Sequence, residues 1–303
     1  MPTPEGPADG LVAAASSARR RPAPVRSTVL RTSRLSPSLV RVVLGGPGMV
    51  PFEAPVHTDS YVKLVFLPAV APTDLPLLPD GRVDLDAVRT ALPADAQPRQ
   101  RAYTVRAFDP GSRELTVDLV VHGDEGVAGP WALAARPGDE LLVLGPGGGY
   151  SPDPAADWHL LAGDASTLPA VAAALERLAE QVPDARGHAV LEVHDAADEL
   201  TLVAPAGITL HWVHQGSGVA GLALVDTVLG LDWADGRVHA FVHGEAGAVR
   251  ELRRYLRVER AVPRADLSIS GYWRLGADDE GWRAGKRDWA REIEESEARA
   301  GLG

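Results

Sequence analysis

The stretch R-A-Y-T-V-R, from Arg101 to Arg106, is the most informative part of the chain. Alternation along a strand would place Arg101 and Tyr103 on one face and Thr104 on the other. Two arginines, a tyrosine and a threonine are unusual for a strand that only builds a core. They suit a flavin dinucleotide, because arginine neutralises a diphosphate, tyrosine lies along a flat ring and threonine donates hydrogen bonds. The alternative is an edge strand with solvated arginines.

A glycine-rich segment, H-G-D-E-G-V-A-G-P-W-A, follows at residues 122–132 and precedes a short predicted helix. Glycines before a helix start leave backbone N–H groups exposed, which suits phosphate binding. The candidate cofactor-binding residues here are His122, Gly126, Ala128, Gly129 and Trp131. The alternative is a glycine-rich turn with Trp131 as a core anchor.

Short β-rich runs separated by turn residues surround these motifs, and such spacing predicts a small β-barrel rather than βαβ units. The runs are Val25–Arg31, Leu39–Leu44, Tyr61–Leu67, Arg101–Ala107, Glu114–Val121 and Glu140–Leu144. The proline-rich stretch Pro68–Pro98 predicts a surface excursion with a helical turn at Leu85–Leu92.

From Pro152 onward, short apolar runs alternate with helical patterns, which predicts a parallel sheet. The expected strands are Trp158–Ala162, Ala189–Val193, Ile208–Val213, Val238–Val242 and Leu267–Ser270. One helix is expected to begin after Ser166, and three more are expected at Leu222–Leu229, Ala246–Val258 and Asp278–Ala300. We therefore expect a disordered tail at 1–24, a β-barrel domain at 25–151, an α/β domain at 152–276 and a C-terminal helix at 277–303.

The composition excludes several classes of protein. Cysteine is absent, which removes disulfides, thiolate metal sites and cysteine nucleophiles. The formal net charge of −11 opposes binding to nucleic acid and to anionic membranes. No apolar stretch is long enough to span a membrane, and the N-terminus lacks the order of a signal peptide. We expect a cytoplasmic monomer without metal ligands, membrane insertion or a nucleic-acid partner.

The motifs together resemble the siderophore-interacting protein family of FAD-dependent ferric-siderophore reductases, within the ferredoxin-reductase-like superfamily. That family carries R-x-Y-T-x-R and then H-G-x-x-G-P-A-S-x-W-A. This chain departs from the second pattern at Val127 and Gly129, so backbone N–H groups replace a serine hydroxyl. Further matches are G-P-G-G at 145–148, L-L-A-G-D-A-S-T-L-P at 160–169, G-E-A at 244–246 and G-Y-W-R at 271–274.

The resemblance implies a β-barrel FAD-binding domain followed by an α/β parallel-sheet NAD(P)H-binding domain. It also implies hydride transfer from NAD(P)H to FAD and single-electron transfer to a ferric siderophore, which releases Fe(II). No side chain is expected to be catalytic itself. The residues expected to bind the nicotinamide cofactor are Asp164, Ser166, Thr167, Gly244, Glu245 and Trp273. A general flavin or ferric-chelate reductase, and a siderophore carrier that keeps FAD, remain alternatives.

NADH is favoured over NADPH because the turn at Asp195–Glu199 is acidic and no arginine stands near Gln215. The arginines of the 246–258 helix are interpreted as a solvated face. They are Arg250, Arg253, Arg254 and Arg257.

Local positive charge would help an acidic protein to bind an anionic siderophore. Lysine is rare here, since Lys63 and Lys286 are the only two among 30 basic Lys and Arg residues. Lys63 lies in D-S-Y-V-K-L, which resembles the family's D-x-H-x-K-L. Lys63, Arg106 and Lys286 are therefore the candidate substrate-binding residues, although a solvated role is an open alternative for Lys286.

Overall fold

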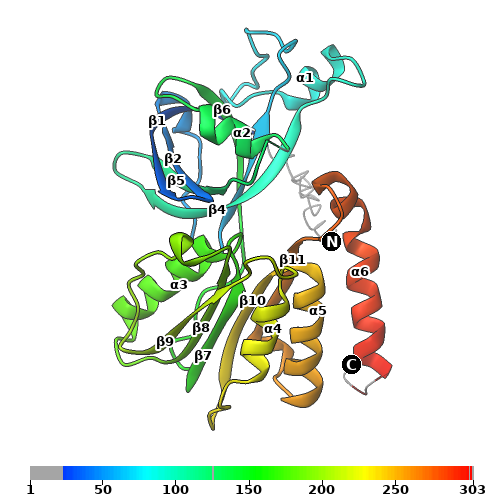
Figure 1. Cartoon of the computed structure of the whole chain (residues 1–303). Helices are drawn as coiled ribbons and strands as arrows, with labels where there is room; N and C mark the ends of the chain where they lie inside the picture. Colours follow the sequence, from blue (N-terminus) through cyan, green and yellow to red (C-terminus); the bar gives the residue numbers. More distant parts are fainter. Residues whose placement is uncertain (1–22, 125, 300, 302–303) are drawn as a thin grey trace, which may run out of the picture.

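The computed structural model describes residues 23–124, 126–299 and 301, and it shows a barrel above a five-stranded sheet (Figure 1). A disordered tail is expected at residues 1–24, and residues 1–22 of it lie outside the described part of the chain. Within the described part, no helix has both the length and the apolar character needed to cross a bilayer.

The first half forms a closed antiparallel barrel with strand order β1-β2-β5-β4-β3-β6. Its strands are β1 (Val25–Ser36), β2 (Leu39–Gly45), β3 (Tyr61–Phe66), β4 (Arg99–Asp109), β5 (Glu114–Val120) and β6 (Glu140–Gly147). Short helices α1 (Leu85–Ala91) and α2 (Ala128–Ala134) lie outside it, with a 3-10 turn at Pro47–Met49. Alternating apolar residues such as Val42, Leu64 and Val117 fill the barrel, so the predicted barrel is confirmed.

The second half is a parallel sheet with strand order β11-β10-β7-β8-β9. Its strands are β7 (Trp158–Asp164), β8 (Arg186–Val193), β9 (Gly207–His214), β10 (Val238–Glu245) and β11 (Leu267–Trp273). The helices are α3 (Leu168–Gln181), α4 (Leu222–Leu229) and α5 (Ala246–Arg254), with single turns at Ala196–Asp198, Tyr255–Glu259 and Arg264–Asp266. Every residue of β7 is buried because helices cover both faces, as parallel sheets require. The strand order reverses between β7 and β10, and ligands of such sheets bind at that point.

The C-terminal helix α6 (Asp279–Arg299) lies along α5 and reaches the barrel with its first turn (Figure 1). Trp282, Trp289 and Ile293 form a buried cluster with Ala246 and Val249 of α5. The predicted apolar stripe therefore docks on the α/β domain.

The interpretation of the arginines of residues 246–258 as a solvated face is wrong for two of them, Arg253 of α5 and Arg257 of the following turn, because α6 covers that face. Arg253 donates two hydrogen bonds to Glu297 of α6, at 2.5 and 2.9 Å. Arg257 lies 3.9 Å from the same carboxylate, and the side chains of Arg253 and Arg257 are only 13% and 12% exposed. Arg250 and Arg254 do remain exposed.

Candidate functional site

The barrel and the sheet meet at the carboxyl ends of β7 and β10. Tyr272 of β11 is partly buried at this meeting point, and desolvation raises the pKa of its phenol. The negative charges of Asp59, before β3, and of Asp164, at the end of β7, raise that pKa further, so both carboxylates lie near Tyr272. The barrel strands that carry the predicted flavin motif thus lie next to the switch point of the sheet.

On β4 the expected alternation breaks. Thr104 and Val105 are both buried, because the pairing of β4 with β5 shifts register between Val105 and Ala107. Tyr103 packs partly against the barrel core, and burial raises its pKa to about 12. Its phenol therefore stays neutral and can donate a hydrogen bond.

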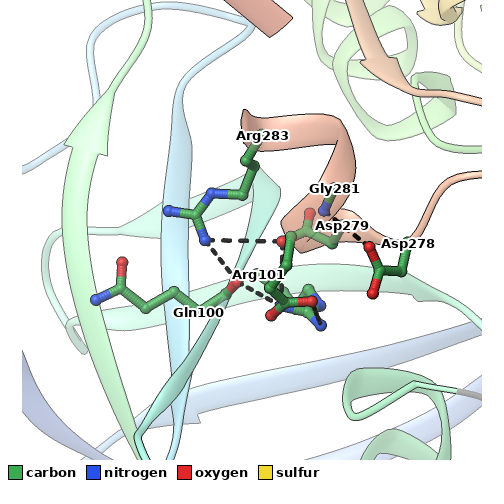
Figure 2. Close-up of polar contacts among 7 residues, drawn as sticks. Gln100, Arg101, Asp278, Asp279, Gly281 and Arg283 are labelled. Atoms are coloured by element: carbon green, nitrogen blue, oxygen red, sulfur yellow. Dashed lines mark hydrogen bonds and ion pairs between the residues drawn. The ribbon is translucent and has the colours of Figure 1, made fainter. Parts of the chain in front are cut away.

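Arg101 is held by two carboxylates from the start of α6 (Figure 2). Its Nη1 lies 3.1 Å from Asp279 Oδ2 and 2.8 Å from Glu280 Oε1, and its Nη2 lies 3.1 Å from Glu280 Oε2. The Arg101 side chain is 14% exposed. Arg101, which is predicted to bind the diphosphate of FAD, thus already makes charged hydrogen bonds within the protein.

In the glycine-rich segment, His122, Gly123, Asp124 and Gly126 are exposed, and α2 begins at Ala128. Gly123 and Gly126 have φ values of 53° and 80°, which favour glycine. Neither would bring an added Cβ within 4 Å of another atom, so their requirement is conformational rather than steric. Trp131 packs edge-on against Phe66, with ring centroids 5.6 Å apart, which supports the core-anchor interpretation for that residue.

Asp164 organises the switch point of the sheet. Its carboxylate accepts hydrogen bonds from Ser166 N, Ser166 Oγ, Glu245 N and Trp273 Nε1, at 2.5–2.9 Å. Desolvation raises its pKa, although these donors oppose that effect. The structure therefore brings three of the predicted nicotinamide-site residues, Ser166, Glu245 and Trp273, around the buried carboxylate of a fourth, Asp164.

Two glycines of the family motifs are required sterically. A Cβ at Gly163 would lie 2.1 Å from Thr167 Oγ1, and a Cβ at Gly244 would lie 2.5 Å from Asp164 Oδ2. Thr167 donates its hydroxyl to the Asp164 carbonyl instead of capping α3. The motif glycines therefore allow β7, β10 and the start of α3 to approach closely.

Buried glutamates cap the starts of α4 and α5, whereas α3 has no such cap. Glu245 accepts from Gly247 N and Ala248 N at the start of α5, at 2.5 and 3.0 Å. Glu192, which sequence reasoning missed, accepts from Gly221 N and Leu224 N at the start of α4, at 2.8 and 3.0 Å. These carboxylates occupy the positive ends of α4 and α5. Among these three helices, α3 alone begins without a carboxylate cap.

The predicted substrate residues fall in different surroundings. Lys63 is half-buried on β3, paired with Ala102 and Leu144, and within the described residues no carboxylate forms an ion pair with it. Lys286 lies over the Trp282 ring at 5.8 Å, and burial lowers its pKa.

Arg106 joins the two halves of the molecule. It donates two hydrogen bonds to Glu176 of α3, one of them at 2.8 Å from Nη1 to Oε2. It also lines a cavity of about 200 Å³ between the barrel and the start of α3. Its carboxylate partner is a feature that sequence reasoning missed.

Two residues of the acidic turn Asp195–Glu199, which favoured NADH in the sequence analysis, make contacts within the protein. Asp198 is buried and accepts from Ser36 Oγ at 2.6 Å and Ser38 N at 2.8 Å, so it joins the turn to the barrel. Glu199 lies 2.7 Å from His214 Nε2. Neither contact could be read from the sequence, because each partner lies elsewhere in the chain.

Known structures place this architecture in a class. The ferredoxin reductase of carbazole 1,9a-dioxygenase aligns with a TM-score of 0.61 at 13% identity, over 82% of this chain and 69% of that one. The fold is thus that of the ferredoxin-reductase-like proteins, with a barrel followed by a parallel sheet.

The family follows from closer matches. A model described as siderophore-interacting FAD-binding domain matches residues 28–150, and one described as siderophore-interacting protein matches residues 156–276. Ferric vibriobactin reductase ViuB of Vibrio cholerae is 34% identical over 84% of this chain and 90% of its own. The structure of the siderophore-interacting protein SipS from Aeromonas hydrophila is 30% identical, with a TM-score of 0.73 over 89% of this chain and 99% of that one. The chain belongs to the siderophore-interacting protein family.

Proposed function

We propose that this protein reduces ferric siderophores with electrons from a nicotinamide nucleotide, through bound FAD. The observation that carries the proposal is the position of the β4 motif beside the switch point of the parallel sheet. A flavin on the barrel and a nicotinamide on the sheet would meet there. The names of the relatives support this substrate class, since ViuB is a ferric vibriobactin reductase.

The described residues fit FAD by their donor chemistry. Tyr103 offers a flat, neutral phenol, Thr104 a hydroxyl, and the exposed Gly123 and Gly126 offer backbone groups. Arg101 supplies the positive charge that a diphosphate needs, although Asp279 and Glu280 already hold it. When bound, FAD would supply the conversion between two-electron and one-electron transfer.

The remaining site residues would position the nicotinamide and the siderophore. Asp164 would keep the start of α3 and Trp273 in place, and Ser166 would contact the nucleotide at that helix start. Thr167, which is fully buried and donates its hydroxyl to the Asp164 carbonyl, would support this turn from behind rather than touch the nucleotide. Lys63 and Lys286 would attract an anionic siderophore from the opening of the site. The ferric ion is substrate in this scheme and needs no protein ligand.

NADH is the reductant that we propose, because no arginine stands near Gln215, whose side chain donates to the Gly218 carbonyl at 3.2 Å. The Escherichia coli relative named NADPH-dependent ferric-chelate reductase is 28% identical over 81% of this chain and 91% of its own. Stopped-flow reduction of the flavin by each nucleotide decides between them. A tenfold larger kcat/KM for NADPH would overturn the preference, and a flavin that neither nucleotide reduces would favour the carrier alternative.

Lys63→Ala is expected to raise the KM for an anionic ferric siderophore roughly fivefold, the equivalent of about 1 kcal/mol for a partly exposed charge pair. Flavin content and reduction by NADH should not change. Steady-state kinetics at low and high salt check this, because salt screens the attraction. Arg89→Ala, which removes an exposed cation from α1, is the matched control. Equal losses on anionic and neutral ferric chelates would exclude a charge role for Lys63.

A further inference from the structure

The first turn of α6, residues Asp279–Trp282, contacts the barrel at the predicted cofactor strand (Figure 2). Asp278 begins the helix by accepting a hydrogen bond from Gly281 N at 2.8 Å. Asp279 and Glu280 then reach Arg101 of β4. Arg283 adds a hydrogen bond to the Gln100 carbonyl at 3.3 Å. The helix therefore meets β4 at two consecutive residues.

The two carboxylates resemble a diphosphate in what they offer to Arg101. They present anionic oxygens to Nη1 and Nη2, which are the donors that bind phosphate in a bidentate manner. The Arg101 hydrogen bond lowers the pKa of Glu280, whereas burial raises the pKa of Asp279. Desolvation thus disfavours the charged form of Asp279 at this position, and Arg101 offsets this cost only in part.

The rest of α6 is anchored independently of this contact. Trp282 is buried against Gly271, where an added Cβ would lie 2.9 Å from the indole. Glu297 holds the far end of the helix through Arg253. Between the sheet and Trp282, residues 274–278 are exposed, and Gly276 has a φ of 77° with no atom within 4 Å of an added Cβ. A local movement of residues 275–281 would free Arg101 without undocking α6.

We propose that Asp279 and Glu280 compete with the diphosphate of FAD for Arg101. A diphosphate that binds Nη1 and Nη2 would have to displace the two carboxylates, because these nitrogens already donate to Asp279 and Glu280 and like charges at one site repel. FAD binding and docking of the α6 first turn on the barrel therefore oppose each other, and each weakens the other to the same extent. This inference rests on the proposed function, since it assumes that FAD binds at Arg101.

The double variant Asp279→Asn/Glu280→Gln tests the competition. FAD titrated into the full-length protein after removal of flavin, followed by flavin fluorescence, should bind the variant about tenfold more tightly than wild type, because less Arg101 is sequestered. The control Glu292→Gln/Glu294→Gln removes two charges from the same helix, where they face Arg250 and Arg264 of the α/β domain. Its FAD affinity should match wild type.

Hydrogen–deuterium exchange supplies a readout that does not depend on turnover. In wild type, FAD should speed the exchange of the backbone amides of residues 276–282, and circular dichroism should confirm that every variant is folded. Glu280→Gln alone, a milder change, should tighten FAD binding by a smaller factor. If wild type binds FAD and the double variant binds it equally or less tightly, the competition is refuted. If no protein binds FAD, the proposed function itself fails.

Discussion

Replacing Glu297 by alanine is expected to lower the free energy of unfolding by about 3–5 kcal/mol, the usual cost of leaving a buried charge without its partner. The Glu297 carboxylate is 8% exposed and serves both Arg253 and Arg257, so its loss strands two buried guanidinium groups. Urea denaturation measures the change. Arg253 comes from α5, Arg257 from the turn Tyr255–Glu259 that follows it, and Glu297 from α6, so the loss falls on the docking of the C-terminal helix.

An exposed pair on the same two helices is the control for this prediction. Glu292 and Arg250 are 57% and 50% exposed and lie 3.0 Å apart, so Glu292→Ala should cost only about 0–1 kcal/mol. Arg253→Met/Glu297→Leu removes the hydrogen-bonded pair and leaves only Arg257 without its partner, so it should recover part of the stability lost in Glu297→Ala. If the two alanine variants are equally stable, the buried ion pairs do not hold α6.

His159→Gln is expected to flatten the dependence of stability on pH between about pH 6.5 and 4. His159 is 1% exposed, its Nδ1 has no hydrogen-bond partner among the described residues, and burial lowers its pKa from 6.5 to about 4. Below pH 6.5 the unfolded chain binds a proton here and the folded chain does not, so acid favours unfolding. Each pH unit across that window costs wild type about 1.4 kcal/mol from this residue alone.

The pH prediction is a difference between two proteins, because other groups also titrate. Burial raises the pKa values of Asp164 and Glu192, which acts in the opposite direction, but their contribution is common to wild type and variant. Urea denaturation at half-unit steps from pH 7.5 to 4.5 measures the slopes, and the exposed His194→Gln is the matched control. Parallel curves for wild type and His159→Gln would show that His159 titrates as freely in the folded chain as in the unfolded one.

The fold could be predicted from sequence because its signals are local. Turn residues between β-rich runs indicated the barrel, and the alternation of β and helical patterns after Pro152 indicated the parallel sheet. The break in alternation at Val105 could not be predicted, because it depends on how β4 pairs with β5.

The site could be predicted only in part, because its charged contacts join distant segments. The motif spacing indicated Asp164, Ser166 and Trp273, and the structure brings them together. The partners of Arg101 lie 178 and 179 positions further along the chain. An acidic pair at a helix start usually indicates a favourable helix dipole interaction, so nothing local pointed from Asp279 and Glu280 to Arg101.

The central claim is that electrons pass from a nicotinamide nucleotide through FAD to a ferric siderophore. Anaerobic absorption spectroscopy of the purified, FAD-loaded protein tests it most directly, with a chelator that reports Fe(II). NADH should bleach the flavin, and a ferric siderophore added next should restore its oxidised spectrum while about two Fe(II) appear for each NADH consumed. A flavin that NADH leaves oxidised, or a reduced flavin that the ferric siderophore does not reoxidise, would contradict the account.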